Sequence, residues 1–421
     1  MSTIFAPITG RGGAVVTLRL SGPQAFSITA SLAGGLPAPR RASLRRLRHG
    51  GRVLDEALVV LFPAPRSFTG EDVAELSLHG GRAVLAAVSE ALTALGARPA
   101  EAGEFSRRAF EAGRMDLLQA EAMADLIAAE TEAQRQQALE GGLQGRYAAW
   151  REELRQLIAR QEALIDFPDE DLPEGVAAGL LQGIGALRDE MQAALEAAPA
   201  AARLRAGLEF VILGPPNAGK STLLNALAGE EVAIVSATPG TTRDAVGVRL
   251  DLGGVPVHLT DTAGLRETED AIEAEGVRRA RARAAAADFV ILAAAPGEAF
   301  PPPPPGAAVL RVRTKADLDP GSPGMRVSAR TGEGMAALRE RLTAEARALT
   351  DRHGAAAPSR PRQLACLRDT VMALDMALEL AEPELRGEEL RAAAQALARL
   401  AGTIGMEEIL DAVFAGFCIG K

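Results

Sequence analysis

Short apolar runs, separated by glycine and proline turns, mark the first part of the 421-residue chain. Alternating apolar and polar positions predict strands within residues 3–9, 14–20, 56–62 and 73–79, and stretches with helical spacing stand between them. This mixture predicts a compact α+β domain at residues 1–118.

Helical periodicity replaces this pattern at residues 119–207, where Ala, Leu, Glu, Arg and Gln dominate. The acidic, proline-containing stretch IDFPDEDLPEG interrupts the helical pattern. We expect antiparallel helices there. Residues 358–414 return to a helical pattern of similar composition, within a second helical segment at residues 351–421. The simplest architecture is one helical domain made of both segments.

Between these segments, residues 208–350 alternate apolar strands with helical stretches. The expected strands lie at 208–214, 255–261, 288–295, 308–315 and 325–329. Such alternation is typical of a parallel sheet with helices on both faces. The fold is therefore predicted to be multidomain, α+β and α/β, with the α/β domain inserted into the helical one.

Composition narrows the class of protein. No apolar run approaches the roughly 18 residues of a membrane span, and the N-terminus lacks a secretory pattern, so we expect a cytoplasmic protein with no membrane partner. The net charge of −9 argues against non-specific coating of nucleic acid but leaves room for a local basic patch. Two cysteines, Cys366 and Cys418, are too few for a disulfide framework or a cysteine zinc site. We interpret Cys366 as structural.

Lysine is nearly absent, and arginine supplies almost all positive charge. The only lysines are Lys220, Lys315 and Lys421. A compact ammonium differs chemically from a planar guanidinium, so these positions are candidates for specific chemistry.

The segment from Gly214 to Ser221 fits G-x-x-x-x-G-K-[ST] between a predicted strand and a predicted helix. In such a loop, backbone N–H groups close on phosphate oxygens, Lys220 reaches the β and γ phosphates, and Ser221 offers a hydroxyl to Mg²⁺. The predicted nucleotide-binding residues are Asn217, Ala218, Gly219, Lys220, Ser221 and Thr222.

Two later motifs extend the site. In the switch-type loop that holds Thr241, the next residue, Thr242, can complete the Mg²⁺ shell. A second motif at the end of an apolar strand places a carboxylate near the metal and a glycine N–H near the γ-phosphate. Its residues are Asp261, Thr262, Ala263 and Gly264.

The base-binding motifs select guanine. Asp317 offers two acceptor oxygens that match the ring N–H and the exocyclic amine of guanine, a pair that adenine lacks. Thr314 stands where such motifs often carry Asn, and we expect it to weaken one loop-stabilising contact. The predicted residues are Thr314, Lys315, Asp317, Ser328, Ala329 and Arg330.

The catalyst of hydrolysis is not evident from these motifs. Leu265 occupies the position of the usual water-orienting glutamine. The carboxylate-rich residues 266–273 and the switch arginines Arg243 and Arg266 are candidates. A solvated mobile loop is the alternative reading.

Several stretches together resemble one family over essentially the whole length of the chain: the tRNA wobble-uridine modification GTPases called MnmE or TrmE. They are GRGGAVVTLRLSGP, SFTGEDVAELSLHGG, GEFSRRAFEAGRMDLLQAEAMADLI, IDFPDED and FCIGK. The resemblance implies a folate-binding α+β N-terminal domain that forms a homodimer, a helical domain, and an inserted Ras-like P-loop GTPase domain activated by K⁺.

The resemblance also assigns roles in catalysis. Glu273 would orient the catalytic water indirectly, which fits the gap left by Leu265, and Cys418 would take part in modification. The expected K⁺ ligands are Asn217, Ser236, Thr238 and Thr241.

The modification implied by the resemblance joins an aminomethyl or carboxymethylaminomethyl group to carbon 5 of wobble uridine 34, with the flavoprotein MnmG as partner in a heterotetramer. 5-formyl- or methylene-tetrahydrofolate would supply the one-carbon unit. By themselves, Arg19 and Glu75 read as ordinary surface charges, and Arg114 departs from the family lysine. The folate contacts implied are Arg19, Glu75, Arg114 and Lys421.

Contacts with tRNA leave a fainter signal. An arginine cluster could bind phosphates or could be a solvated basic loop. Its members are Arg40, Arg41, Arg45, Arg46, Arg48 and Arg52. A ribosome-assembly GTPase and a membrane-polymerising GTPase are the alternative classes. The first would need a basic RNA-binding module and the second an amphipathic insertion segment, and the sequence shows neither.

Overall fold

The computed structural model describes residues 1–10, 12–139, 143–166, 176–229, 247–261, 282–319, 324–351, 357–402 and 420. The chain forms two compact units. One combines Met1–Ala124 with Ala398–Lys421, and the other is Asp125–Leu397. Among the described residues, no helix combines the length and the apolar character needed to cross a membrane.

The first unit is built on a six-stranded sheet with the order β3-β4-β5-β2-β1-β6. Neighbouring strands are antiparallel except for β1 and β6, which run parallel. The strands are β1 (Ile4–Pro7), β2 (Val15–Ser21), β3 (Ser43–His49), β4 (Arg52–Phe62), β5 (Val73–His79) and β6 (Arg98–Pro99).

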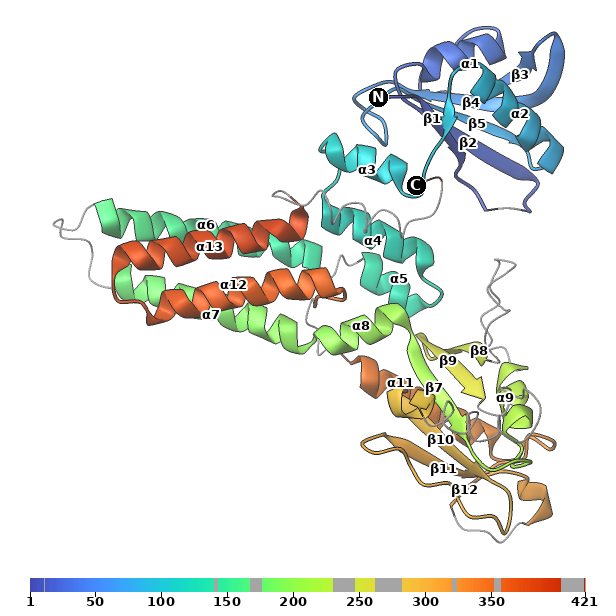
Figure 1. Cartoon of the computed structure of the whole chain (residues 1–421), viewed down its shortest axis with the longest axis vertical. Coiled ribbons are helices and arrows are strands. Elements are labelled where there is room, and N and C mark those ends of the chain that lie inside the picture. Colours follow the sequence, from blue (N-terminus) through green and yellow to red (C-terminus); the bar gives the residue numbers. More distant parts are fainter. Residues whose placement is uncertain are drawn as a thin grey trace. The chain divides into compact units, whose positions relative to one another are not determined.

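The two faces of this sheet carry different side chains because alternate residues of a strand point to opposite sides. Leu18 and Leu20 of β2 belong to a core with residues of helices α1 (Ala25–Ala33) and α2 (Arg82–Ala94). Figure 1 shows these two helices beside the sheet. On the opposite face, Ile4 and Ala6 pack with Phe105 of helix α3 (Glu104–Glu111). Arg19, between Leu18 and Leu20, therefore lies on the α3 side.

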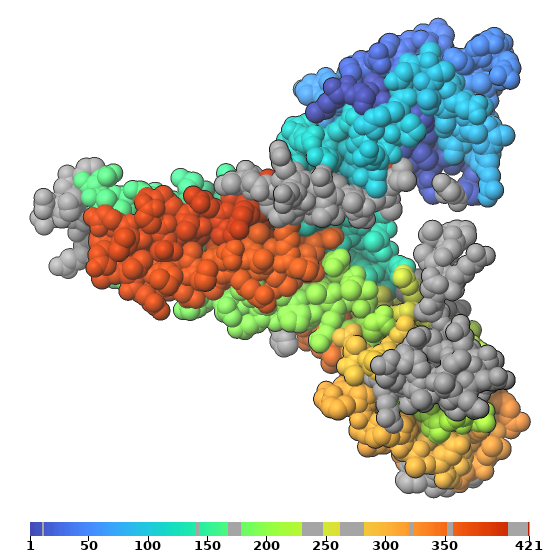
Figure 2. All heavy atoms as spheres, viewed as in Figure 1, coloured from blue at the N-terminus to red at the C-terminus, as the bar shows by residue number. Residues whose placement is uncertain are grey.

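The second unit contains a helical part. Helices α6, α7, α12 and α13 lie side by side (Figures 1 and 2). Gln161 of α6 donates a 2.9 Å hydrogen bond to the Pro383 carbonyl at the start of α13, so segments more than 200 residues apart are joined. The helices are α5 (Glu132–Leu139), α6 (Leu143–Asp166), α7 (Val176–Glu196), α8 (Ala198–Ala206), α12 (Pro361–Glu379) and α13 (Pro383–Ala401), preceded by α4 (Leu117–Ala128).

The second unit also contains a six-stranded sheet with the order β12-β11-β10-β7-β9-β8. Apolar strands buried on both faces fill its centre, as expected when helices cover a parallel sheet. The elements are β7 (Leu208–Leu213), α9 (Lys220–Ala228), β8 (Gly247–Leu252), β9 (Val255–Asp261), β10 (Phe289–Ala294), β11 (Val309–Arg313), β12 (Met325–Arg326) and α11 (Met335–Thr350).

Two features correct the sequence interpretation. The sheet is not wholly parallel, because β8 pairs antiparallel with β9 through the tight turn at Gly253 and Gly254. The arginine cluster is not a loop, because β3 and β4 form a hairpin that contains most of it.

Candidate functional site

The loop between β7 and α9 has the backbone shape of a phosphate cradle. Asn217 and Gly219 adopt positive φ angles of 63° and 80°, and Gly219 caps the N-terminus of α9. A Cβ atom on Gly214 would lie 2.2 Å from the carbonyl oxygen of Ala293, so only glycine fits there. The predicted loop at Gly214–Ser221 is thus present, and a helix N-terminus behind it favours an anion.

Two polar side chains at the end of this loop make hydrogen bonds within the site, the buried Lys220 and the exposed Ser221. Lys220 is only 5% exposed, and its Nζ donates hydrogen bonds of 3.0 and 2.8 Å to the carbonyls of Gly214 and Pro215. Ser221 donates a hydrogen bond to Asp261, which is buried at the end of β9. A hydroxyl beside a carboxylate is a set of hard oxygen donors that fits Mg²⁺. Thr222 follows on the exposed side of α9.

The base-side motif is bonded directly to the phosphate loop. Thr314 is 3% exposed and donates a 2.6 Å hydrogen bond to the Ala218 carbonyl. Lys315 donates a 2.8 Å hydrogen bond to the Asn217 carbonyl. Thr314 therefore supplies a loop contact of its own, where the sequence interpretation expected a weakened one.

Asp317 is held by two neighbours from the next motif. The buried Ser328 hydroxyl donates to one carboxylate oxygen at 2.7 Å, and Arg330 donates to the other at 2.7 and 3.1 Å. The Ser328 hydrogen bond, followed by Arg330, holds the pKa of Asp317 below its ordinary value. The carboxyl is therefore an ionised acceptor, as guanine recognition requires. Ala329 lies between its two partners in sequence.

The remaining nucleotide-site predictions fall outside the described residues. They are Ser236, Thr238, Thr241, Thr242, Thr262, Ala263, Gly264 and Glu273, together with Arg243, Leu265 and Arg266. Of the expected K⁺ ligands, Asn217 alone is described, and its exposed amide offers the oxygen donor that such an ion needs.

In the first unit, Arg19 and Glu75 face each other on paired strands. Their register partners them across β2 and β5, and two hydrogen bonds of 2.8 and 3.0 Å join them. The Arg19 guanidinium lies 4.8 Å from the centre of the Phe68 ring and 5.8 Å from that of Phe105. The sequence interpretation missed these two rings, although both stand in stretches that resemble the family.

The other expected folate contacts are placed only in part. Arg114 is exposed, and its side chain lies beside Gly70, where an added Cβ would be 3.4 Å from its Cγ. Cys418 and Lys421 lie outside the described residues. Gly420, between them, is buried with a φ of 108°, and an added Cβ would lie 2.2 Å from the Pro7 carbonyl. Gly420 of the C-terminal motif thus lies against the end of β1.

The basic hairpin of β3 and β4 contains both paired and unpaired arginines. Arg46 pairs with Glu56 across the strands at 2.5 Å. Within the part of the chain that the structure describes, Arg48 and Arg52 of the hairpin, and Arg41 just before it, are exposed and have no ion-pair partner. Three cations of this surface are therefore open to an anion.

Comparison with known proteins agrees with this arrangement. A family model described as the MnmE helical domain matches residues 117–418, and one described as the GTP-binding protein TrmE N-terminus matches residues 3–114. A tRNA modification GTPase MnmE of Acidiphilium cryptum is 61% identical over 99% of this chain and 98% of its own length. The tRNA modification GTPase MnmE of Gluconacetobacter diazotrophicus is 54% identical over 99% of this chain and 98% of its own length. That of Granulibacter bethesdensis is 52% identical over 100% of this chain and 99% of its own length.

Proposed function

The chain belongs to the MnmE family of tRNA modification GTPases, and on this premise we propose that K⁺ activates its hydrolysis of GTP during modification of wobble uridine 34. It is a GTP hydrolase of tRNA modification. The observation that carries the finer proposal is the bond from Lys315 to the Asn217 carbonyl, because it joins the base-binding motif to the expected K⁺ ligand.

We assign the nucleotide steps to residues of the second unit. Lys220 binds the β and γ phosphates, Ser221 and Thr242 hold Mg²⁺, and Asp317 selects guanine. Glu273 orients the attacking water indirectly. When bound, K⁺ would supply positive charge beside the phosphates. Its ligands would be Asn217, Ser236, Thr238 and Thr241.

The modification is proposed to use a folate one-carbon unit bound in the first unit. The adjacent charges of Arg19 and Glu75 support this, because a carboxylate can pair with an aminopyrimidine edge and a cation can hold a glutamyl tail. Arg114 and Lys421 would complete the contacts, and Cys418 would take part in the chemistry. The product is an aminomethyl or carboxymethylaminomethyl group on C5 of the uridine, made by a homodimer with the flavoprotein MnmG in the cytoplasm.

We further propose that the β3–β4 hairpin contacts tRNA phosphates. The support is its density of arginines in a chain of net charge −9, with Arg41, Arg48 and Arg52 exposed. Lys and Arg contacts to phosphate give affinity without sequence preference.

The deciding experiment compares GTP hydrolysis by the full chain in KCl and in NaCl at matched ionic strength. We expect strong stimulation by K⁺. Equal rates would leave the GTPase intact and overturn the K⁺ proposal. Addition of MnmG, tRNA and 5-formyl- or methylene-tetrahydrofolate, with analysis of uridine 34, tests the modification in the same preparation.

A further inference from the structure

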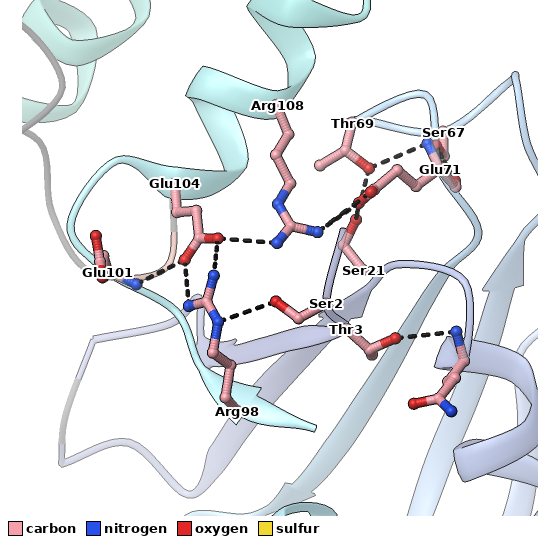
Figure 3. A network of polar contacts seen from close by, with 11 residues as sticks. Ser2, Thr3, Ser21, Ser67, Thr69, Glu71, Arg98, Glu101, Glu104 and Arg108 are labelled. Atoms are coloured by element: carbon pink, nitrogen blue, oxygen red, sulfur yellow. Dashed lines mark hydrogen bonds and ion pairs between the residues drawn. The ribbon is translucent and has the colours of Figure 1, made fainter. Parts of the chain in front are cut away.

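A chain of ion pairs, centred on the buried Arg108, runs beside the proposed folate residues in the first unit (Figure 3). Arg108 of α3 is 6% exposed and donates to both carboxylate oxygens of Glu71, at 3.0 and 3.2 Å. It also donates to Glu104 at 2.8 Å. Arg98 binds Glu104 from the other side at 2.5 and 2.8 Å. The buried Arg108 therefore has two carboxylate partners, and Arg98 binds one of them from the exposed side.

The Glu71 end of the network fixes a loop between β4 and β5. Ser21 of β2 donates to Glu71 at 2.6 Å and bonds Thr69 at the same distance. The Ser67 hydroxyl donates to the Glu71 carbonyl at 2.5 Å. Residues 67–71 are therefore bonded to the sheet through Ser21 and to α3 through Arg108 (Figure 3).

The same loop and helix supply the surroundings of the proposed folate residues. Phe68 of the loop and Phe105 of α3 lie on the Arg19 guanidinium. Gly70 of the loop lies against the Arg114 side chain, three residues beyond α3. Because the Arg108–Glu71 pair joins the two segments, it sets the spacing of both rings around Arg19.

We propose that Arg108 and Glu71 are positioning residues for folate binding, acting through Phe68 on Arg19 and through Gly70 on Arg114. This inference rests on the proposed folate site. The position of Arg108 requires arginine, because one planar guanidinium donates hydrogen bonds to both Glu71 and Glu104. A lysine ammonium is a point charge without that fixed geometry.

The test measures binding of 5-formyltetrahydrofolate to the full chain by calorimetry at low temperature, with thermal unfolding and GTP hydrolysis recorded alongside. Arg108→Lys and Glu71→Gln are expected to weaken binding about tenfold, the scale seen when supporting residues behind a site are removed. GTP hydrolysis should stay unchanged. Arg107→Lys is the matched control, because Arg107 is the neighbouring residue and pairs at the surface with Glu111.

A double-mutant cycle separates positioning from a general loss of stability. If Arg108 acts through the loop, Arg108→Lys and Phe68→Leu should lower folate affinity less together than the sum of their separate effects. Unchanged affinity in both network variants, or strictly additive losses, would overturn the inference alone. No binding to the unaltered chain would overturn the folate proposal and this inference with it.

Discussion

Lys315 donates a 2.8 Å hydrogen bond to the backbone carbonyl of Asn217, whose φ of 63° is one that few residues other than glycine adopt. Together with the neighbouring bond from Thr314 to Ala218, it fixes two consecutive carbonyls of the phosphate loop from the base-binding side. The backbone of the phosphate loop and the proposed base-binding motif are thereby linked.

Lys315→Ala should therefore weaken nucleotide binding and reduce the effect of K⁺ on the rate of nucleotide dissociation. Loss of a charged hydrogen bond predicts roughly tenfold faster dissociation of a fluorescent GDP in KCl. The difference between KCl and NaCl should shrink at the same time. Stopped-flow dissociation in the two salts measures both, with Arg311→Ala, an exposed change on neighbouring β11, as control. A variant that keeps the wild-type ratio between salts would contradict the link.

Asp317→Asn should exchange guanine for xanthine specificity. The side-chain N–H of asparagine can donate a hydrogen bond to the carbonyl that xanthine has in place of the exocyclic amine of guanine. Asparagine has only one side-chain acceptor oxygen, so it cannot accept both hydrogen bonds from guanine. The expected cost is about 100-fold or more in GTP affinity, with a gain for xanthosine triphosphate. Competition binding with both nucleotides checks this. Unchanged preference for GTP would show that Asp317 does not read the base.

Glu104 is expected to make the stability of the first unit depend on pH. Burial opposes its ionisation, but hydrogen bonds from Arg98, the Glu101 amide and Arg108 outweigh burial and hold its pKa below the ordinary value. Its ionised form therefore adds stability above that ordinary value, and this stability is lost as the pH falls through the lowered pKa.

Glu104→Gln should accordingly cost about 1–3 kcal/mol of unfolding free energy near neutral pH and progressively less below about pH 4. Unfolding of the full chain monitored across this range gives the comparison. Glu111→Gln, at an exposed pair, should show almost no difference at any pH. A deficit that stays constant down to about pH 3 would refute the linkage to this carboxyl.

A triple variant in which Arg41, Arg48 and Arg52 are changed to Ala should bind tRNA more weakly. The affinity of this variant for tRNA should also depend less steeply on salt concentration. Each lost phosphate contact lowers the slope of log affinity against log salt by about one. Filter binding over a salt series measures the slope, while GTP hydrolysis without tRNA should not change. The control is a second triple variant that removes the same charge away from the hairpin, with the exposed residues Arg151, Arg160 and Arg311 changed to Ala. Equal slopes for the two triple variants would exclude the hairpin as a tRNA contact.

Strands with a regular apolar pattern were predictable from the sequence, because burial of one or both faces demands that pattern. The strand predicted at 255–261 coincides with β9, and the run at 73–79 with β5. Strand β3 was not predicted. It lies at the sheet edge, where Leu47 alone is buried and three of the other positions are arginines, so its sequence resembles a solvated loop.

The residues of the candidate sites were likewise predictable where a local sequence motif contains them and not where the fold brings them together. Lys220 and Asp317 stand in local motifs whose spacing reveals their chemistry. The pairing of Arg19 with Glu75 depends on strand register across 56 residues, which no local pattern contains. The network from Arg98 through Glu104 and Arg108 to Glu71 was hidden for the same reason, since only the Glu104–Arg108 step has helical spacing.

The buried contact of Gly420 with Pro7 also orders events during synthesis. About 400 residues separate the two, so at usual elongation rates β1 leaves the ribosome roughly 20 to 80 seconds before its partner exists. A chain interrupted anywhere in that interval has the strands of the first unit without the glycine that packs against β1. The folate chemistry proposed for the first unit, which would use Lys421 as well as Arg19, would thereby be withheld from unfinished polypeptides.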